Sequence, residues 1–183
     1  MANIVVKGNS GLFENEIELY GKYASEIRFL KDEAGVFNSL RDAYMVAAIV
    51  GFITKANVKV NEEENVKEAS IFSDEIKRRR KDLRFIYQLI MLLDDNPDYN
   101  IDDYKNRTFR DDPEEYPETI QENMTLFNNY VCKGLDYLYD KFINCTHLDE
   151  TVDTLYNFLH ELAIATDLIH DDEELPDFTP DFH

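Results

Sequence analysis

The sequence has few of the residues from which catalytic and cofactor sites are usually built. Six glycines occur in 183 residues, and none lies in a Gly-x-Gly or Gly-Lys-Ser/Thr setting, so a phosphate-binding loop is not expected. The two cysteines and four histidines do not form the closely spaced sets that hold a metal ion. A Gly-x-Ser-x-Gly nucleophile motif is also missing. We therefore expect a protein without a cofactor, a bound metal or an enzymatic activity.

Long apolar runs are lacking as well. The longest, Ala43 to Ile53, is interrupted by Gly51 and is too short to span a bilayer, and the N-terminus has no basic region followed by an apolar core. Cys132 and Cys145 fall in one predicted helix, about 20 Å apart along its axis, which is too far for a disulfide. These features favour a cytoplasmic protein with reduced cysteines and no contact with a membrane.

Basic residues are scarce relative to acidic ones. The chain has 19 Lys and Arg against 38 Asp and Glu, a formal net charge of −19. A surface this negative repels phosphate backbones at long range. Direct nucleic-acid binding is therefore not expected, and the favoured partner is a protein with a basic surface.

One basic run interrupts this acidic background, formed by Lys77, Arg78, Arg79, Arg80 and Lys81. Consecutive residues of a helix point about 100° apart, so the five side chains cannot all face one ligand. We interpret the run as a solvated face with salt bridges to Asp74, Glu75 and Asp82. The alternative is contact with a nucleic acid or with an acidic partner, including another copy of this chain.

Apolar residues are abundant enough for a folded core, since 44% of the residues are hydrophobic and 13% are aromatic. The length indicates one domain, residues 1–169, followed by a loose acidic tail, residues 170–183. The fold class predicted is all-α, a bundle of about five helices with acidic loops. A short N-terminal strand at Ile4–Val6 or Ile17–Leu19 is the alternative to an arm packed on the bundle.

Hydrophobic periodicity and capping residues place the helices. A short helix is predicted over 22–31 and ends near Gly35. Ser39 caps the next, whose segment Ala43 to Ile53 is apolar on nearly every face and is predicted to be the most buried. After a loop at 61–65, or a small hairpin around Val58 and Val60, Ser73 is expected to cap a helix ending at Asp94.

Two antiparallel helices complete the predicted bundle, the first over 117–144 and the second capped by Thr146 and Asp149. One-sided apolar stripes define the inner faces of the later helices. In the helix from Ser73 the stripe is Ile76, Leu83, Ile86, Tyr87, Ile90 and Leu93. In the last two helices it is Ile120, Met124, Phe127, Val131, Leu135, Leu138 and Phe142, then Val152, Leu155, Leu159, Leu162 and Ile169.

The acidic connector, residues 94–118, is the predicted partner-binding site. Ten acidic residues lie in it, interleaved with aromatic residues that can supply desolvated anchors. We expect charge to steer a basic partner and the aromatic side chains to hold it. The candidate contact residues are Asp94, Asp95, Tyr99, Asp102, Asp103, Tyr104, Phe109, Asp111 and Asp112.

Three segments carry a resemblance to a known family: 36–52, with Ala47-Ala48 and Gly51-Phe52; 82–92, with Ile86-Tyr87; and 129–135, with Tyr130 and Gly134-Leu135. Together they resemble the Dnd-system-associated accessory proteins, which are encoded beside DNA phosphorothioation genes. The resemblance covers roughly residues 35–145, and its motifs are typical of helix packing. It implies an accessory protein of a bacterial DNA-modification or phage-defence system, with no catalytic residues to carry over.

Three other functions remain open. Carboxylates arrayed on helices can imitate DNA phosphates, which suits an inhibitor that occupies the DNA channel of an enzyme. A DNA-binding regulator would use the basic run instead. A hydrolase would use a pair of carboxylates, but no pair is singled out by an apolar setting in the sequence.

Overall fold

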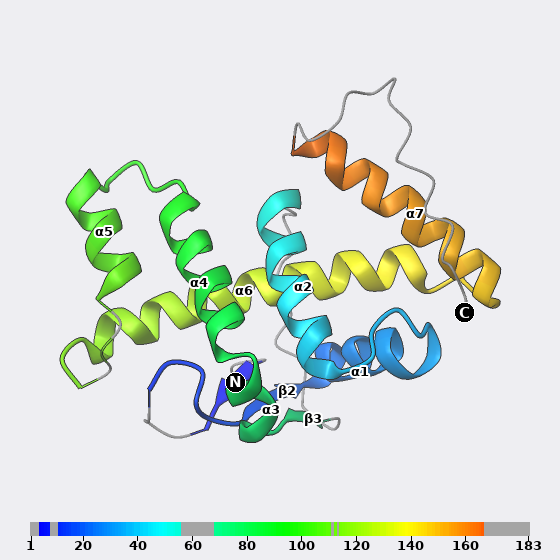
Figure 1. Ribbon diagram of the computed structural model, residues 1–183, viewed down its shortest axis with the longest axis horizontal. Coiled ribbons are helices and arrows are strands. Elements are labelled where there is room, and N and C mark those ends of the chain that lie inside the picture. Colours follow the sequence, from blue (N-terminus) through cyan, green and yellow to red (C-terminus); the bar gives the residue numbers. More distant parts are fainter. Residues whose placement is uncertain (1–3, 8–10, 56–67, 111, 113, 167–183) are drawn as a thin grey trace.

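The computed structural model describes residues 4–7, 11–55, 68–110, 112 and 114–166. Within these residues the chain forms seven α-helices, one π-helical turn and three β-strands. Figure 1 shows the long helix α6 (Pro117–Phe142) running across the molecule, with α2 (Leu40–Thr54) crossing it. Helices α4 (Arg80–Leu93) and α5 (Ile101–Phe109) lie toward one end of α6, and α7 (Leu148–Ala165) lies over the other. The predominantly helical fold is confirmed.

A small antiparallel sheet corrects the all-α prediction. Its strands are β1 (Ile4–Val6), β2 (Ile17–Tyr20) and β3 (Glu68–Ile71), in the order β1-β2-β3. Both candidate N-terminal strands therefore form, with Ile4 opposite Leu19. Strand β3 was not predicted because Ile71 is the one residue of its Glu-Ala-Ser-Ile sequence with a high strand propensity. The predicted hairpin around Val58 and Val60 and the loop at 61–65 lie outside the described residues.

Helix α1 (Gly21–Arg28) and the π-helical turn η1 (Phe29–Glu33) follow β2 directly. They correspond to the helix predicted over 22–31. Gly35 ends this segment with a φ of +65°, a left-handed conformation that glycine adopts without strain. Arg28, Asp32 and Glu33 remain exposed, while Tyr23, Ile27 and Leu30 are buried.

The crossing of α2 and α6 is a direct contact between helix backbones. A Cβ atom on Gly134 would lie 1.9 Å from the backbone oxygen of Ala47, and one on Gly51 would lie 1.9 Å from that of Tyr130. No other residue type fits at either glycine without moving the helices apart. The Ser39 hydroxyl begins α2 by accepting a hydrogen bond from the Asp42 N–H at 3.1 Å, as predicted.

Helix α2 has no exposed residue, in agreement with its predicted burial. Its fully buried face contains Ala43, Tyr44, Ala47, Ala48, Val50 and Gly51. Val46 is only half-buried and packs at the edge of the core. The Tyr44 ring contacts Phe127 of α6, and its hydroxyl donates a hydrogen bond to Asn128 at 2.6 Å.

The helix predicted from Ser73 to Leu93 is in fact two helices. Helix α3 (Ser73–Arg78) and α4 are separated at Arg79, whose φ and ψ of −118° and 20° leave the helical region. Ser73 is the first residue of α3 rather than its cap, because Phe72 occupies the N-cap position. The predicted inner face is otherwise buried, but Leu93 is exposed and Met91 is buried in its place.

Helices α6 and α7 form the predicted helix pair, but they differ in how firmly they pack. The α6 stripe is buried from Ile120 to Phe142, apart from the half-buried Met124. In α7, Val152 and Leu159 are exposed, contrary to prediction, and Phe158 is buried against Tyr137 and Phe142. The N-cap of α7 is His147 rather than the predicted Thr146 or Asp149, and Glu150 accepts hydrogen bonds from the N–H groups of Thr146 and His147. Ile169 lies outside the described residues.

A pair of carboxyl groups is buried between α1 and α6. Glu26 and Asp136 each have one oxygen without another hydrogen-bond partner, and Lys22 forms an ion pair with Asp136 at 2.6 Å. Burial, together with the charge of Asp136 and a hydrogen bond to it, raises the pKa of Glu26 to about 8. One proton shared between the two carboxyl groups would give each of these oxygens a hydrogen-bond partner, and Lys22 would balance the remaining negative charge.

The Gly134→Ala substitution should prevent normal folding, because the added methyl group would overlap the backbone oxygen of Ala47. The matched control is Gly35→Ala, whose methyl group meets no atom within 4 Å. The control suffers only the positive φ, at a cost of about 1 kcal/mol. Thermal unfolding followed by circular dichroism compares the two variants. Equal losses of melting temperature would contradict the backbone contact.

The Glu26→Gln substitution should flatten the dependence of stability on pH. Below about pH 4.5, the ordinary pKa, Glu26 is protonated in the folded and unfolded chain alike. Between pH 4.5 and about 8 only the unfolded chain loses this proton, so the free energy of unfolding falls as the pH rises. Glutamine can still donate to Asp136 but has no proton to lose. Melting temperatures from pH 5 to 9, with the exposed Glu33→Gln as control, test this, and parallel curves for all three proteins would argue against a shared proton.

Candidate partner-binding surface

The acidic connector folds around the short helix α5. The Asn100 side chain begins α5 by accepting hydrogen bonds from the N–H groups of Asp102 and Asp103 at 2.8 and 3.2 Å. Asp103 returns the interaction by accepting from the Asn100 N–H at 2.9 Å. This reciprocal arrangement is a capping box. One predicted contact residue, Asp103, therefore stabilises the start of the helix.

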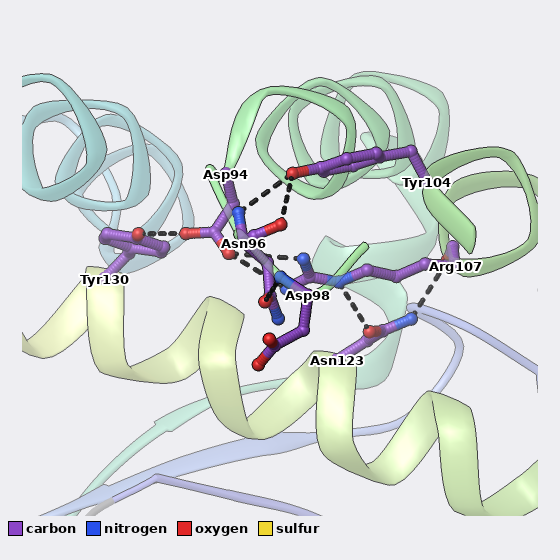
Figure 2. Close-up of polar contacts among 7 residues, drawn as sticks. All are labelled: Asp94, Asn96, Asp98, Tyr104, Arg107, Asn123 and Tyr130. Carbon is purple, nitrogen blue, oxygen red and sulfur yellow. Dashed lines mark hydrogen bonds and ion pairs between the residues drawn. The ribbon is translucent and has the colours of Figure 1, made fainter. Parts of the chain in front are cut away.

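Arg107 of α5 connects the connector to α6. Its guanidinium lies 3.2 Å from Asp94 through both terminal nitrogens, and its Nε donates to Asn123 at 3.1 Å. Asn123 donates in return to the Arg107 backbone oxygen at 3.0 Å. Figure 2 shows these residues converging from the end of α4, from α5 and from α6. The side chains of Arg107 and Asp94 are only 8% and 16% exposed, so little solvent screens their charges.

Asp94 has a third partner in Tyr130 of α6, whose hydroxyl donates to its other carboxylate oxygen. Burial, followed by this hydrogen bond, raises the pKa of Tyr130 above its usual range. Asp94 is thus satisfied on both oxygens by groups of its own chain. Asp94, a predicted contact residue for a partner, therefore also fixes the position of the connector.

Tyr104 and Tyr99 close the loop between α4 and α5. The Tyr104 hydroxyl accepts a hydrogen bond from the Asn96 N–H at 2.8 Å and donates to the Asn96 oxygen at 3.0 Å. The Tyr99 ring packs on that of Tyr104, with centroids 5.6 Å apart, and the Arg107 guanidinium lies 5.4 Å from the Tyr99 centroid. Tyr104 therefore stabilises the loop, and the Tyr99 ring packs against both Tyr104 and Arg107.

The outer surface of the connector combines exposed acids with exposed apolar side chains. Ile101 is 70% exposed and Phe109 is 58% exposed. Asp95, Asp98 and Asp102 are exposed in the same segment, with Asp102 paired to Lys105 at 3.3 Å. Asp112 is also exposed and accepts a hydrogen bond from the Glu114 N–H at 2.9 Å, while Asp111 lies outside the described residues.

The predicted site therefore separates into two groups. Asp94, Asp103 and Tyr104 hold the connector together, and Asp95, Tyr99, Asp102, Phe109 and Asp112 are presented outward. Ile101 belongs with the outward group, although it was not among the predicted contact residues. The roles of Arg107 and Asn123 were not predicted. Arg107 lies 13 residues from Asp94 and 16 residues from Asn123 along the chain, too far for a local sequence pattern to relate them. We use the name connector surface for five exposed residues of the connector: Asp95, Tyr99, Ile101, Asp102 and Phe109.

The basic run does not form one patch. Arg78 pairs with Asp74 at 3.3 Å and Arg79 with Asp82 at 3.2 Å, as predicted for two of the three expected acids. Arg80 turns toward the N-terminal loop, where it pairs with Glu14 at 2.5 Å and donates to the Leu12 backbone oxygen at 3.0 Å. Lys77 and Lys81 are exposed. The three arginines of the run therefore pair with acids of three different segments: α3, α4 and the N-terminal loop.

Replacing Arg107 with methionine should loosen the connector, because Asp94 would lose its cation in a poorly solvated position. We expect a loss of about 3 kcal/mol in the free energy of unfolding, the low end of the range for removing one partner of a buried ion pair. Amide exchange in residues 94–109 should also accelerate. The matched control is Arg110→Met, because Arg110 is exposed. Denaturant titration and hydrogen exchange measure both effects, and identical behaviour of the two variants would show that Arg107 does not hold the connector.

Within the described ranges, no group of three or more His, Cys, Asp or Glu side chains is placed to hold a metal ion. Nor, over the same residues, is any helix long and apolar enough to cross a membrane. Comparisons with protein-family models, with curated proteins and with solved structures find no match to this chain.

Proposed function

We propose that this protein is a non-enzymatic interaction protein that binds a protein partner with a basic surface through the connector surface. The observation that carries the proposal is the exposure of Ile101 and Phe109 among acidic side chains on a segment that its own hydrogen bonds hold in place. Large apolar side chains exposed on a fixed surface are typical of binding sites. Their fixed position reduces the entropy lost on binding.

Charge and apolar contact have different roles in this proposal. The net charge of −19 attracts a basic partner from a distance and raises the association rate. The apolar side chains act only at contact, where their desolvation slows dissociation. Tyr104, which we had expected to anchor the partner, acts indirectly by shaping the loop that carries Tyr99.

The cellular setting that we propose comes from the resemblance to the Dnd-system-associated accessory proteins. An accessory protein of a DNA-modification or phage-defence system would use such a surface to join an assembly whose other members carry basic, DNA-binding surfaces. In this chain the glycines of the resembling segments, Gly51 and Gly134, lie in the α2–α6 crossing, which agrees with their interpretation as packing residues.

The second candidate function is an acidic inhibitor that imitates DNA, and the charge of −19 favours it. A DNA-binding regulator has less support, because Arg78, Arg79 and Arg80 are paired with acids of the same chain. The exposed apolar residues of the connector favour a protein partner over either rival, since imitation of a phosphate backbone needs no apolar anchor.

A double variant, Ile101→Ser with Phe109→Ser, should lose the partner while keeping the fold. The immobilised protein is used to capture proteins from the cells that make it, and mass spectrometry identifies what the parent retains and the variant does not. The matched control is Leu148→Ser with Tyr156→Ser, which removes two exposed apolar side chains from α7. With the identified partner, we expect at least a tenfold faster dissociation for the connector variant and an association rate of the parent that falls with added salt.

Three outcomes would count against the proposal. Equal retention of the partner by both variants would place the binding site elsewhere. Displacement of the partner by duplex DNA, with no effect of the connector variant, would favour the DNA-imitating inhibitor. Tight binding of duplex DNA by the parent at low salt, abolished by neutralising Arg78, Arg79 and Arg80, would favour the regulator.

A further inference from the structure

The outer face of α4 carries a second set of exposed apolar side chains, separate from the connector surface. Phe85 is 65% exposed, and Leu89 and Leu92 are exposed as well. Their spacing of four and three residues places them on one stripe, which with Lys81 spans about 80° of the helix circumference. The opposite side of α4 is buried in the core through Leu83, Tyr87 and Ile90. We call Lys81, Phe85, Leu89 and Leu92 the α4 outer face.

Helices that are apolar on both sides are normally covered on both sides. A surface helix of one domain usually has a charged or polar outer face, and contiguous exposed apolar residues mark an interaction site. The core of this chain covers only the inner side of α4. The α4 outer face therefore needs a partner of its own.

The charges at the two ends of the face identify that partner. Lys81 is exposed at the N-terminal end, and Asp95 and Asp98 are exposed just beyond the C-terminal end. The ends of the face thus have opposite signs, with the apolar stripe between them. The helix from Lys81 to Leu93 is about 18 Å long at the helical rise, and Asp95 follows the extended residue Asp94 at its end. A surface with this arrangement is complementary to itself when one copy is turned end to end against another.

We infer that the protein forms a two-fold symmetric dimer in which two α4 helices pack antiparallel through their outer faces. With the symmetry axis near Gln88 and Leu89, Phe85 meets Leu92 of the second copy, and Lys81 meets Asp95 of the second copy. Each of these contacts occurs twice. Both ends of the helix pair therefore carry opposite charges in contact.

Other occupants fit this face less well. A nucleic acid would use the basic end but would leave the apolar stripe uncovered. A protein with a basic surface would be repelled by Lys81. An anionic lipid surface would accept the basic end and the stripe, but it would be repelled by Asp95, Asp98 and the net charge of −19. Only a second copy of the chain satisfies the basic end, the apolar stripe and the acidic end together.

The size and charge of the chain set the strength of the dimer. Two helices of 14 residues bury less surface than a standard stable interface, so we expect a dissociation constant on the order of 10 μM. Two copies that each carry −19 repel one another at long range, but at about 0.15 M salt this repulsion is screened beyond about 8 Å. The contacts between opposite charges act at shorter range.

Sedimentation equilibrium of the full chain at about 0.15 M salt, from about 5 to 500 μM, tests the dimer. The parent should approach twice its mass of 21.5 kDa as its concentration rises. Phe85→Ser with Leu89→Ser should weaken self-association at least tenfold, and Leu148→Ser with Tyr156→Ser on α7 should leave it unchanged. Circular dichroism and melting temperature establish that each variant is folded. A monomeric parent at every concentration, or a dimer indifferent to the Phe85 and Leu89 changes, would overturn the proposal.

A charge exchange tests the antiparallel register. Lys81→Asp alone and Asp95→Lys alone should each weaken the dimer, because each places like charges opposite one another twice. Both changes in one chain restore opposite charges at both ends, so the double variant should dimerise nearly as well as the parent. Failure of the double variant to recover would overturn the register. Binding of the parent to vesicles containing anionic lipid, lost on the Phe85 and Leu89 changes, would assign the face to a membrane surface instead.

The test is independent of the proposed function. The variants Ile101→Ser and Phe109→Ser lie on α5 and leave the α4 outer face intact, and the Phe85 and Leu89 changes leave α5 intact. Asp95 is the one residue that belongs to both surfaces. A monomeric protein that still captures a partner would reject the dimer alone, and a dimer that captures nothing would reject the connector proposal alone.

Discussion

The contact between the backbones of α2 and α6 is the constraint on which the rest of the structure depends. Gly51 and Gly134 bring the two helices together without side chains between them. Because α2 covers the middle of α6 so closely, the two ends of α6 extend past it (Figure 1). One end receives α4, α5 and the connector, and the other receives α7. Both surfaces discussed above therefore depend on the angle and depth of this crossing, although neither contains a residue of it.

The connector is held by polar contacts rather than by apolar burial. Helix α5 buries Arg107 and Thr108, so it has no apolar stripe with which to join the core. The hydrogen bonds of Arg107 with Asp94 and Asn123 replace such a stripe. Because a hydrogen bond is directional, they also fix the orientation of α5 relative to α6. The consequence is that Ile101 and Phe109 are not needed for packing and remain exposed. A connector with an ordinary apolar stripe would have used these side chains in its own core.

Sequence patterns predicted the features that depend on neighbours within one helix. The α6 stripe and the Ser39 cap follow from spacings of three or four residues, and the end of α4 at Asp94 follows from the acids and the proline just after it. The break at Arg79 does not, because Arg80 bonds to Leu12 and Glu14, far away in the chain. Leu93 fitted the inner stripe by spacing, yet Met91 is buried instead. The sequence predicted which residues belong to the candidate site, but not which of its acids face the protein interior. That depends on the contacts of Arg107 with Asp94 and Asn123.

The basic run shows how the number of charges and their arrangement act at different distances. At distances beyond the Debye length, five cations are outweighed by the surrounding acids, and the chain behaves as a polyanion. At contact distance their positions matter individually. Arg80 binds the N-terminal loop, Arg79 pairs with Asp82 in the first turn of α4, and Lys81 lies at the end of an apolar stripe. A net charge therefore predicts which partners approach the protein, while the apolar residues beside each charge determine which of them stay bound, and on this chain those residues lie on α4 and α5.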